Sequence, residues 1–398
     1  MHKALVNGLI VIAVLLLCVW LASVTGSTAI NGGLGPDGPA YAAMLTDHDI
    51  TRGSANTRMV PALLLFAAVP YAAIGDVVLS FRIANFGALA LLVLAGCLIL
   101  DEVSAPTVVK ACAAFTLGVM ALPAAVFDPI QPYLVAVALA ALAVALAGTD
   151  DGPSEALLAI AHVGATLAAP VGIIAPLYGL ARRWRIGRRD LASLFAFVPA
   201  LVIWLAIQFW ARGGLVGLVD LVRPGRVSGN TVMWGEGAFA MLGLYFLVTC
   251  FGGFSVLLVA SQGTVRRAIS ERPELLALTL PVCLFVATAG LDVPRTVQFF
   301  LPFWLIVLGV WVQGRRGALT VPLILSMAVT LYTARPGFRL DDVSYYANYF
   351  PYTVHAGRTR VTYPELWSLW TMRLLVVATA IVVLGVLQRP PRPAVEAT

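Results

Sequence analysis

Apolar stretches long enough to cross a lipid bilayer recur along almost the whole chain, from Leu5 to Leu387. A membrane-spanning helix needs about 20 mostly apolar residues. Of the 398 residues, 60% are hydrophobic and only 12% are charged, and the charge collects in the short segments between the stretches. This composition excludes a water-soluble core. We therefore expect an all-α, polytopic transmembrane helix bundle of about 12 spans, with residues 1–398 forming a single transmembrane domain.

The net charge of +6 comes from short clusters of arginine that lie between apolar stretches. The positive-inside rule accounts for such clusters, so nucleic acid is not an expected partner. It also predicts a multi-pass protein of the cytoplasmic (inner) membrane whose arginine clusters face the cytoplasm. The first apolar run, after Lys3, is read as an uncleaved span, with a cleaved signal peptide as the alternative. The four clusters are Arg182, Arg183, Arg185, Arg188 and Arg189; Arg266, Arg267 and Arg272; Arg315 and Arg316; and Arg389 and Arg392.

Between the clusters, the spans pair so that the chain returns to the cytoplasm each time. The expected pairs are 191–210 with 237–260, 275–290 with 297–313, and 318–332 with 367–387. The loops predicted to face outward are 26–58, 211–236, 291–296 and 333–366. The first and last of these carry most of the polar and aromatic side chains, so chemistry is expected in the outward loops.

Two stretches leave the path of the chain open. Residues 60–79 form either a full span or an amphipathic helix at the outer interface, because Pro61, Pro70, Gly75 and Asp76 interrupt them. Residues 156–181 form either one long span or two short ones broken near Pro170. The two combinations give the same number of crossings, and Asp128 lies on the outer side only if 60–79 is interfacial.

Three places combine charge with a position between spans. Asp37 follows the first span on a glycine- and proline-rich loop, and Tyr41 is four residues later, on the same face of a short helix. Asp128 interrupts an apolar region in the sequence AlaValPheAspPro. Arg295 stands at the mouth of a span, where a guanidinium can hold a phosphate. Each also has an ordinary explanation: a solvated loop acid, a boundary residue, or an interfacial anchor.

Taken in this order, the three places resemble the GT-C superfamily of membrane glycosyltransferases, which includes lipid A aminoarabinose transferases and protein O-mannosyltransferases. ProAspGlyProAlaTyr at 36–41 is similar to the family's acid and aromatic in the first outward loop, which also holds interfacial helices. AlaValPheAspPro at 125–129 resembles its second acid, and ProArgThrValGlnPhePheLeuProPhe at 294–303 its basic residue near the donor phosphate. The chain departs from the family near 165–172, where many relatives carry a lysine, and Asp37 has no adjacent second acid.

The resemblance implies transfer of a sugar from a polyprenyl-phosphate donor to a glycan, lipid or protein acceptor on the outer face of the membrane. It implies Asp37 as the general base, Asp128 as a supporting acid that orients the acceptor or holds a divalent metal ion, and Arg58 and Arg295 as phosphate ligands, with Tyr41 at the substrate. The aromatic loop 333–366, which includes Tyr345, either covers this site or forms an interfacial belt. The alternative function is a multi-pass transporter or lipid flippase. Two observations disfavour it: there is no clear internal repeat and no charged residue central in an apolar run.

Overall fold

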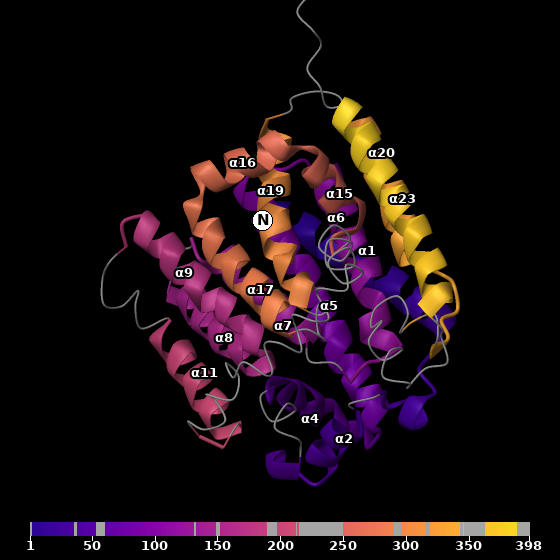
Figure 1. Ribbon diagram of the computed structural model, residues 1–398. Coiled ribbons are helices and arrows are strands. Elements are labelled where there is room, and N and C mark those ends of the chain that lie inside the picture. Colours follow the sequence, from indigo (N-terminus) through magenta and orange to yellow (C-terminus); the bar gives the residue numbers. More distant parts are fainter. Residues whose placement is uncertain are drawn as a thin grey trace, which may run out of the picture.

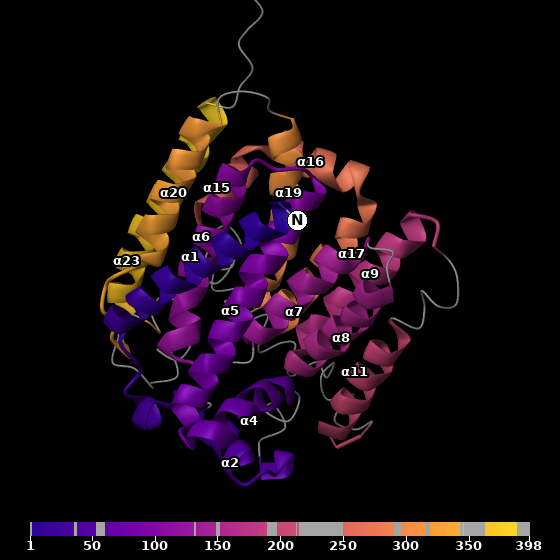
Figure 2. The same cartoon turned by 180° about the vertical axis from the view of Figure 1, so that it is seen from behind.

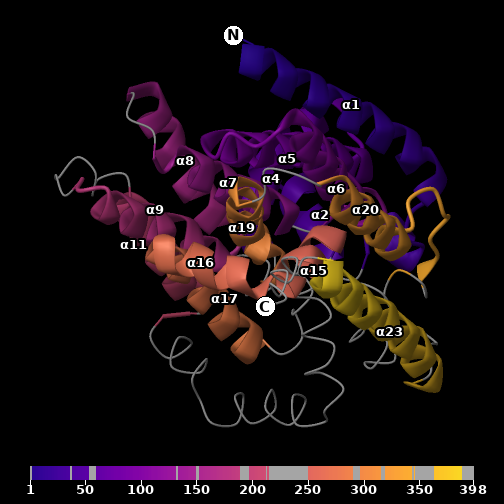
Figure 3. The same cartoon turned by 90° about the horizontal axis from the view of Figure 1, so that it is seen from above.

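The structure is a computed structural model that describes residues 2–35, 38–52, 60–130, 133–148, 152–188, 197–211, 213–214, 250–289, 296–314, 319–342, 345 and 363–387. Every regular element in these ranges is a helix (Figure 1). Most of the longer helices run up and down the bundle, whereas α1 crosses it obliquely (Figures 2 and 3). Seen from above, α5, α7 and α19 are central, while α1, α11 and α23 lie at the periphery (Figure 3).

Three described helices are long and apolar enough to cross a membrane: α1 (His2–Thr25), α5 (Val77–Glu102) and α6 (Thr107–Val126). α1 packs against α5 and α6 at the outside of the bundle (Figure 2). One stripe of α1 is buried there, and its opposite face presents large apolar side chains to the surroundings. A buried polar triad joins the three helices: Lys110 Nζ lies 2.8 Å from Asp101 Oδ1 and 3.1 Å from Asn7 Oδ1, and Asn7 donates to Asp101 at 2.6 Å. The described chain is therefore a helical bundle with the apolar spans of a membrane protein.

The other elements are shorter. They are η1 (Ile30–Gly33), α2 (Gly38–Thr46), η2 (Ile50–Arg52), α4 (Ala62–Ile74), α7 (Tyr133–Leu146), α8 (Gly152–Ala168), η3 (Pro170–Ile173), α9 (Ile174–Arg185), α11 (Val198–Ala211), α15 (Gly252–Ala260), α16 (Gln262–Glu271), η4 (Pro273–Leu275), α17 (Leu276–Ala289), η5 (Val297–Phe300), α19 (Leu301–Gln313), α20 (Thr320–Ala334) and α23 (Tyr363–Leu387).

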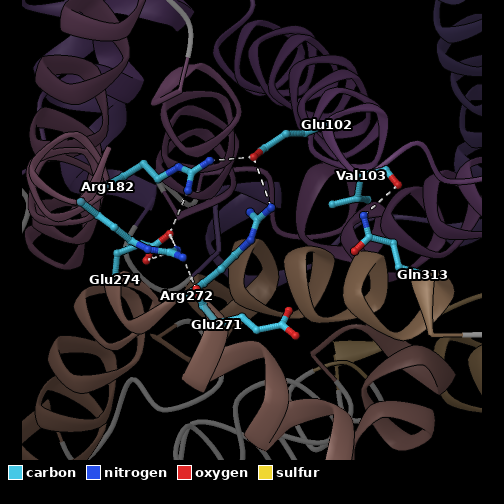
Figure 4. Close-up of polar contacts among 8 residues, drawn as sticks. Glu102, Val103, Arg182, Glu271, Arg272, Glu274 and Gln313 are labelled. Atoms are coloured by element: carbon cyan, nitrogen blue, oxygen red, sulfur yellow. Dashed lines mark hydrogen bonds and ion pairs between the residues drawn. The ribbon is translucent and has the colours of Figure 1, made fainter. Parts of the chain in front are cut away.

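Two of the arginine clusters meet at one end of the bundle, and the cytoplasmic side of that end stays a prediction. Arg182 at the end of α9 and Arg272 after α16 both pair with Glu102 of α5, at 2.9 and 3.4 Å (Figure 4). Arg182 and Arg185 also bind Glu274, whose side chain is only 1% exposed. A buried carboxylate is stable as an ion only when it is paired in this way. Residues 315–316, 389 and 392 lie outside the described residues.

The opposite end of the bundle holds α2 and α4, the helices that follow α1 (Figure 1). With 13 residues, α4 is shorter than the roughly 20 that a span requires. It ends at Gly75, which has a φ of 73° and donates to Tyr71 O, and Asp76 then caps α5 by accepting from the backbone of Leu79 at 2.9 Å. The stretch 60–79 is thus one short helix that ends at Gly75, followed by the start of α5; this break is consistent with the interfacial alternative.

The stretch 156–181 is two helices, not one. Glu155 at the start of α8 pairs with Arg183 and Arg188 at the end of α9, so the two helices run antiparallel. The chain reverses at η3, where a β-carbon on Gly172 would overlap the carbonyl oxygen of Ala165. Only glycine permits this close approach, because it lacks the β-carbon.

Candidate functional site

Asp128 lies in the turn that follows α6, and its side chain is fully buried. Three hydrogen bonds hold the backbone carbonyls around it. Arg82 Nε donates to Val126 O at 3.2 Å, the backbone N–H of Thr28 to Phe127 O at 3.0 Å, and Asn85 Nδ2 to Pro129 O at 2.6 Å. Two of these donors come from α5 and one from the first loop, so the orientation of this turn is set by both.

The first loop approaches the Asp128 carboxylate through Gly35. Gly35 has a φ of 74°, and a β-carbon built on it would overlap Asp128 Oδ1 and lie 2.9 Å from Cγ. The side-chain amide of Asn31 donates to Gly35 O at 2.8 Å and fixes the loop locally. A glycine is required here both by its backbone conformation and by the neighbouring carboxylate.

The predicted site residues divide into two groups. Asp128 and Tyr41 are described, and both are buried, Tyr41 on α2. Asp37, Arg58 and Arg295 lie outside the described residues. The described neighbours of Asp37 are close to Asp128: Gly35 contacts its carboxylate, and a β-carbon on Gly38 would lie 3.4 Å from Ile130 Cδ1.

The segment downstream of Arg295 also reaches this end of the bundle. Phe299 of η5 packs edge-on against Tyr133, with ring centroids 6.4 Å apart. Tyr133 opens α7, five residues after Asp128. The described flanks of Asp37 and Asp128 therefore meet at one turn, and the segment after Arg295 packs against the start of the helix that follows it.

A strap formed by the described residues 335–342 and 345 covers the first loop. Leu340 N donates to Thr25 O at 3.0 Å, and the carboxylate of Asp342 accepts from Thr28 Oγ1 at 2.6 Å. The ring of Tyr345 lies 4.5 Å from that of Phe127, and both are buried. Tyr345 is thus buried beside the candidate site, neither in an exposed aromatic belt nor open to a sugar.

Sequence reasoning missed Asp342, Arg82 and Asn85. The adjacent acids at 341 and 342 were a visible signal within a loop otherwise read for its aromatic and basic residues. The signal for Arg82 and Asn85 was their position in the first turns of an apolar span, where polar side chains are costly unless they have a purpose.

Arg373 corrects a prediction about charge inside the spans. Arg373 lies inside the predicted span 367–387 and ten residues after the start of α23 at Tyr363, and it is only 4% exposed. A charged residue does therefore lie well inside an apolar helix. This removes one of the two observations that disfavoured a transporter.

Metal ligands are scarce in the part of the chain that the structure describes. No three His, Cys, Asp or Glu side chains there come close enough to hold a metal ion. Asp128 alone does not make such a site, and we derive no step through a metal. Comparison of the chain with protein-family models, curated proteins and solved structures found no match in any of the three.

The contact between Gly35 and Asp128 leads to a direct test. Gly35→Ala is expected to destabilise the protein by about 1–3 kcal/mol more than Gly32→Ala, because overpacking adds to backbone strain. Gly32 is a matched control: its φ is 66°, but a β-carbon there meets nothing within 4 Å. Melting temperatures in detergent would measure the difference between the two glycine variants. In a protein that also carries Asp128→Ala, this difference should disappear, because the carboxylate that alanine would overlap is absent. Equal losses for the two glycine variants would show that the contact is not present.

Proposed function

We propose that this chain is a GT-C-type glycosyltransferase of the cytoplasmic membrane, with about 12 membrane crossings, that moves a sugar from a polyprenyl-phosphate donor to an acceptor on the outer face. The observation that carries the proposal is the contact between Gly35 and the Asp128 carboxylate. It joins the loop that contains Asp37 to a second, buried acid at the end of the bundle opposite the paired arginine clusters.

Asp37 is the proposed general base. The acceptor hydroxyl oxygen attacks the anomeric carbon from the side opposite the phosphate, and Asp37 takes the hydroxyl proton. The bond from the anomeric carbon to the phosphate oxygen breaks, and the polyprenyl phosphate leaves with the electron pair. This displacement inverts the anomeric carbon. It is assisted by positive charge at the leaving phosphate, for which Arg58 and Arg295 are the candidates.

Asp128 has a different proposed role from Asp37. Its carboxylate is fully buried, and the carbonyls around it are held by Arg82, Asn85 and the backbone of Thr28. A side chain in such a fixed turn is suited to orienting the acceptor or the loop that carries the base. Tyr41, buried on α2 one turn after Asp37, is placed to support the same loop.

A transporter or lipid flippase is the second candidate, and Arg373 favours it, because ionisable residues inside membrane spans commonly line a substrate path. The two functions differ in chemistry. A transferase consumes the donor, whereas a flippase moves it across the membrane and leaves it chemically unchanged.

The fate of the lipid donor distinguishes a transferase from a flippase. Proteoliposomes containing the full chain and an extract of cell-envelope acceptors should convert a radiolabelled polyprenyl-phosphate sugar to polyprenyl phosphate and a labelled product. Vesicles without the protein are the control, and a nucleotide sugar should not replace the lipid donor. Transfer from a nucleotide sugar without lipid would contradict the lipid-donor assignment. Movement of intact donor between leaflets without product would identify a flippase.

A further inference from the structure

An apolar groove runs between α20 and α23 at one edge of the bundle, where the two helices lie side by side (Figures 1 and 2). Its volume is about 340 Å³, at the lower end of the size of ligand pockets. Along α23 its lining extends from Met372 to Leu384, a rise of about 18 Å at 1.5 Å per residue. Leu325 and Val329 of α20 form the other wall, and among the described lining residues only Thr379 is polar. Such a groove suits a long apolar chain without polar groups.

Two arginines stand beyond the end of this groove at which α20 terminates. Arg335 caps α20 in a left-handed conformation with a φ of 44°, and Arg339 follows on the strap. Both are exposed, and in the described part of the chain neither guanidinium forms an ion pair. Both lie in a loop predicted to face outward, where the positive-inside rule does not account for arginine. Their charge is complementary to a phosphate at the membrane surface.

The strap connects this end of the groove to the candidate site. The side chain of Arg339 approaches Gly26, with its Cγ 3.8 Å from the position of a β-carbon there. Two residues further along the first loop, Thr28 binds the carbonyl of Phe127, next to Asp128. Two residues span at most about 7 Å. A phosphate held at Arg339 would therefore lie beside the first loop, which leads within two residues to the turn of Asp128.

We infer that α20 and α23 bind the isoprenoid chain of a polyprenyl phosphate and that Arg335 and Arg339 bind its phosphate. The grounds are the apolar groove, the two arginines at its end and the strap that leads to Asp128. This inference rests on the proposed function for its choice of lipid. It gives the apolar tail of the donor a binding site. The predicted ligands Arg58 and Arg295 concern only the phosphate of the donor.

Photolabelling tests the inference without requiring turnover. A polyprenyl phosphate with a diazirine on its chain is incubated with the full-length protein in nanodiscs of phosphatidylcholine. The labelled peptides are expected to come from α20 and α23. Ala380→Trp should reduce labelling about tenfold, because Ala380 lines the groove and the indole would fill it. Ala378→Trp is the matched control, since Ala378 is exposed on the same helix but does not line the groove, and it should leave labelling unchanged.

The headgroup is tested in the same system. Arg335→Gln together with Arg339→Gln should lower labelling by polyprenyl phosphate about tenfold, as expected for the loss of charge-assisted hydrogen bonds, but should not lower labelling by polyprenol. Arg52→Gln, an exposed arginine in the first loop, is the control. Labelling outside α20 and α23, or labelling that Ala380→Trp does not change, would overturn the assignment. Equal competition by phosphatidylglycerol would show an ordinary phospholipid site and would also overturn it.

The two proposals fail in distinguishable ways. If the groove is labelled as expected but the proteoliposomes transfer no sugar, the lipid site stands and the glycosyltransferase proposal fails. If Ala380→Trp transfers sugar at the normal rate and affinity, the transferase stands and the groove is not the site of the donor chain.

Discussion

Asp37→Asn is expected to reduce sugar transfer by about 10²- to 10⁴-fold, the usual contribution of a general base. Asparagine keeps the size and much of the hydrogen bonding of aspartate, but it cannot accept the proton of the acceptor hydroxyl. Asp37 lies between Gly35, which contacts the Asp128 carboxylate, and Gly38, which is packed near Ile130. Because asparagine preserves the shape of the side chain, the loss should appear in kcat while the melting temperature in detergent stays close to that of the parent protein.

Asp47→Asn and Asp49→Asn are matched controls in the same loop. Asp47 pairs with Arg52 at 3.3 Å, and Asp49 accepts from the backbone and hydroxyl of Thr51 at 2.8 and 2.7 Å. These acids have local partners at an exposed surface, where ion pairs contribute little, so their replacement should change transfer less than twofold, or by under about 0.5 kcal/mol. If Asp37→Asn transferred sugar normally and one of the controls lost most of its activity, the general base would be the acid replaced in that control and not Asp37. Normal transfer by all three variants would remove the chemical basis of the transferase proposal.

Gly253→Ala is expected to destabilise the folded protein strongly and to reduce the amount recovered as a monodisperse species in detergent. Gly253 is the second residue of α15, where this helix packs against α20. A β-carbon there would overlap the carbonyl oxygen of Ser326 and lie 2.5 Å from its carbon and 2.6 Å from its Cα. The obstacle is helix backbone, which cannot rotate away as a side chain can. The backbone N–H of Gly253 also donates to Thr330 Oγ1 at 3.0 Å, and this bond would be lost when the helices separate. The cost should reach or exceed about 3 kcal/mol, the upper part of the range for overpacking.

Gly87→Ala provides the comparison for this prediction. Gly87 lies within α5 and is exposed, and a β-carbon there would meet nothing within 4 Å. Alanine at this position should be neutral or should stabilise by up to about 1 kcal/mol through helix propensity. Thermal unfolding followed by fluorescence-detected size exclusion would rank the variants. If Gly253→Ala melted at the temperature of Gly87→Ala, α15 and α20 would not be packed as closely as the structure indicates.

Much of the fold could be predicted because the bilayer imposes a length and an apolar character on each span. The boundaries of α1, of α17 with α19, and of α20 followed from this pattern within a few residues. The start of α23 did not. Its first turn, which contains Tyr363 and Glu365, is polar enough to resemble a loop, so the predicted span started at 367. Arg373 lay inside the predicted span 367–387 as well, and its charge there was overlooked.

The sequence by itself determined that the chain is an apolar helical bundle and that four clusters of arginine lie between its apolar stretches, because hydropathy and charge act locally along the chain. Tertiary structure alone decided where the chain turns back, as at Gly172, and which distant segments meet, as Gly35 does with Asp128 and Asp342 with Thr28. For 60–79 and 156–181, the alternatives involve the same apolar residues and lead to the same number of membrane crossings. Hydropathy could therefore not choose between them. The structure shows where each stretch breaks: the first at a left-handed Gly75 with an Asp76 cap, and the second at a reversal held by ion pairs from Glu155 to Arg183 and Arg188. Such contacts depend on the packing of residues far apart in the chain, which no local pattern encodes.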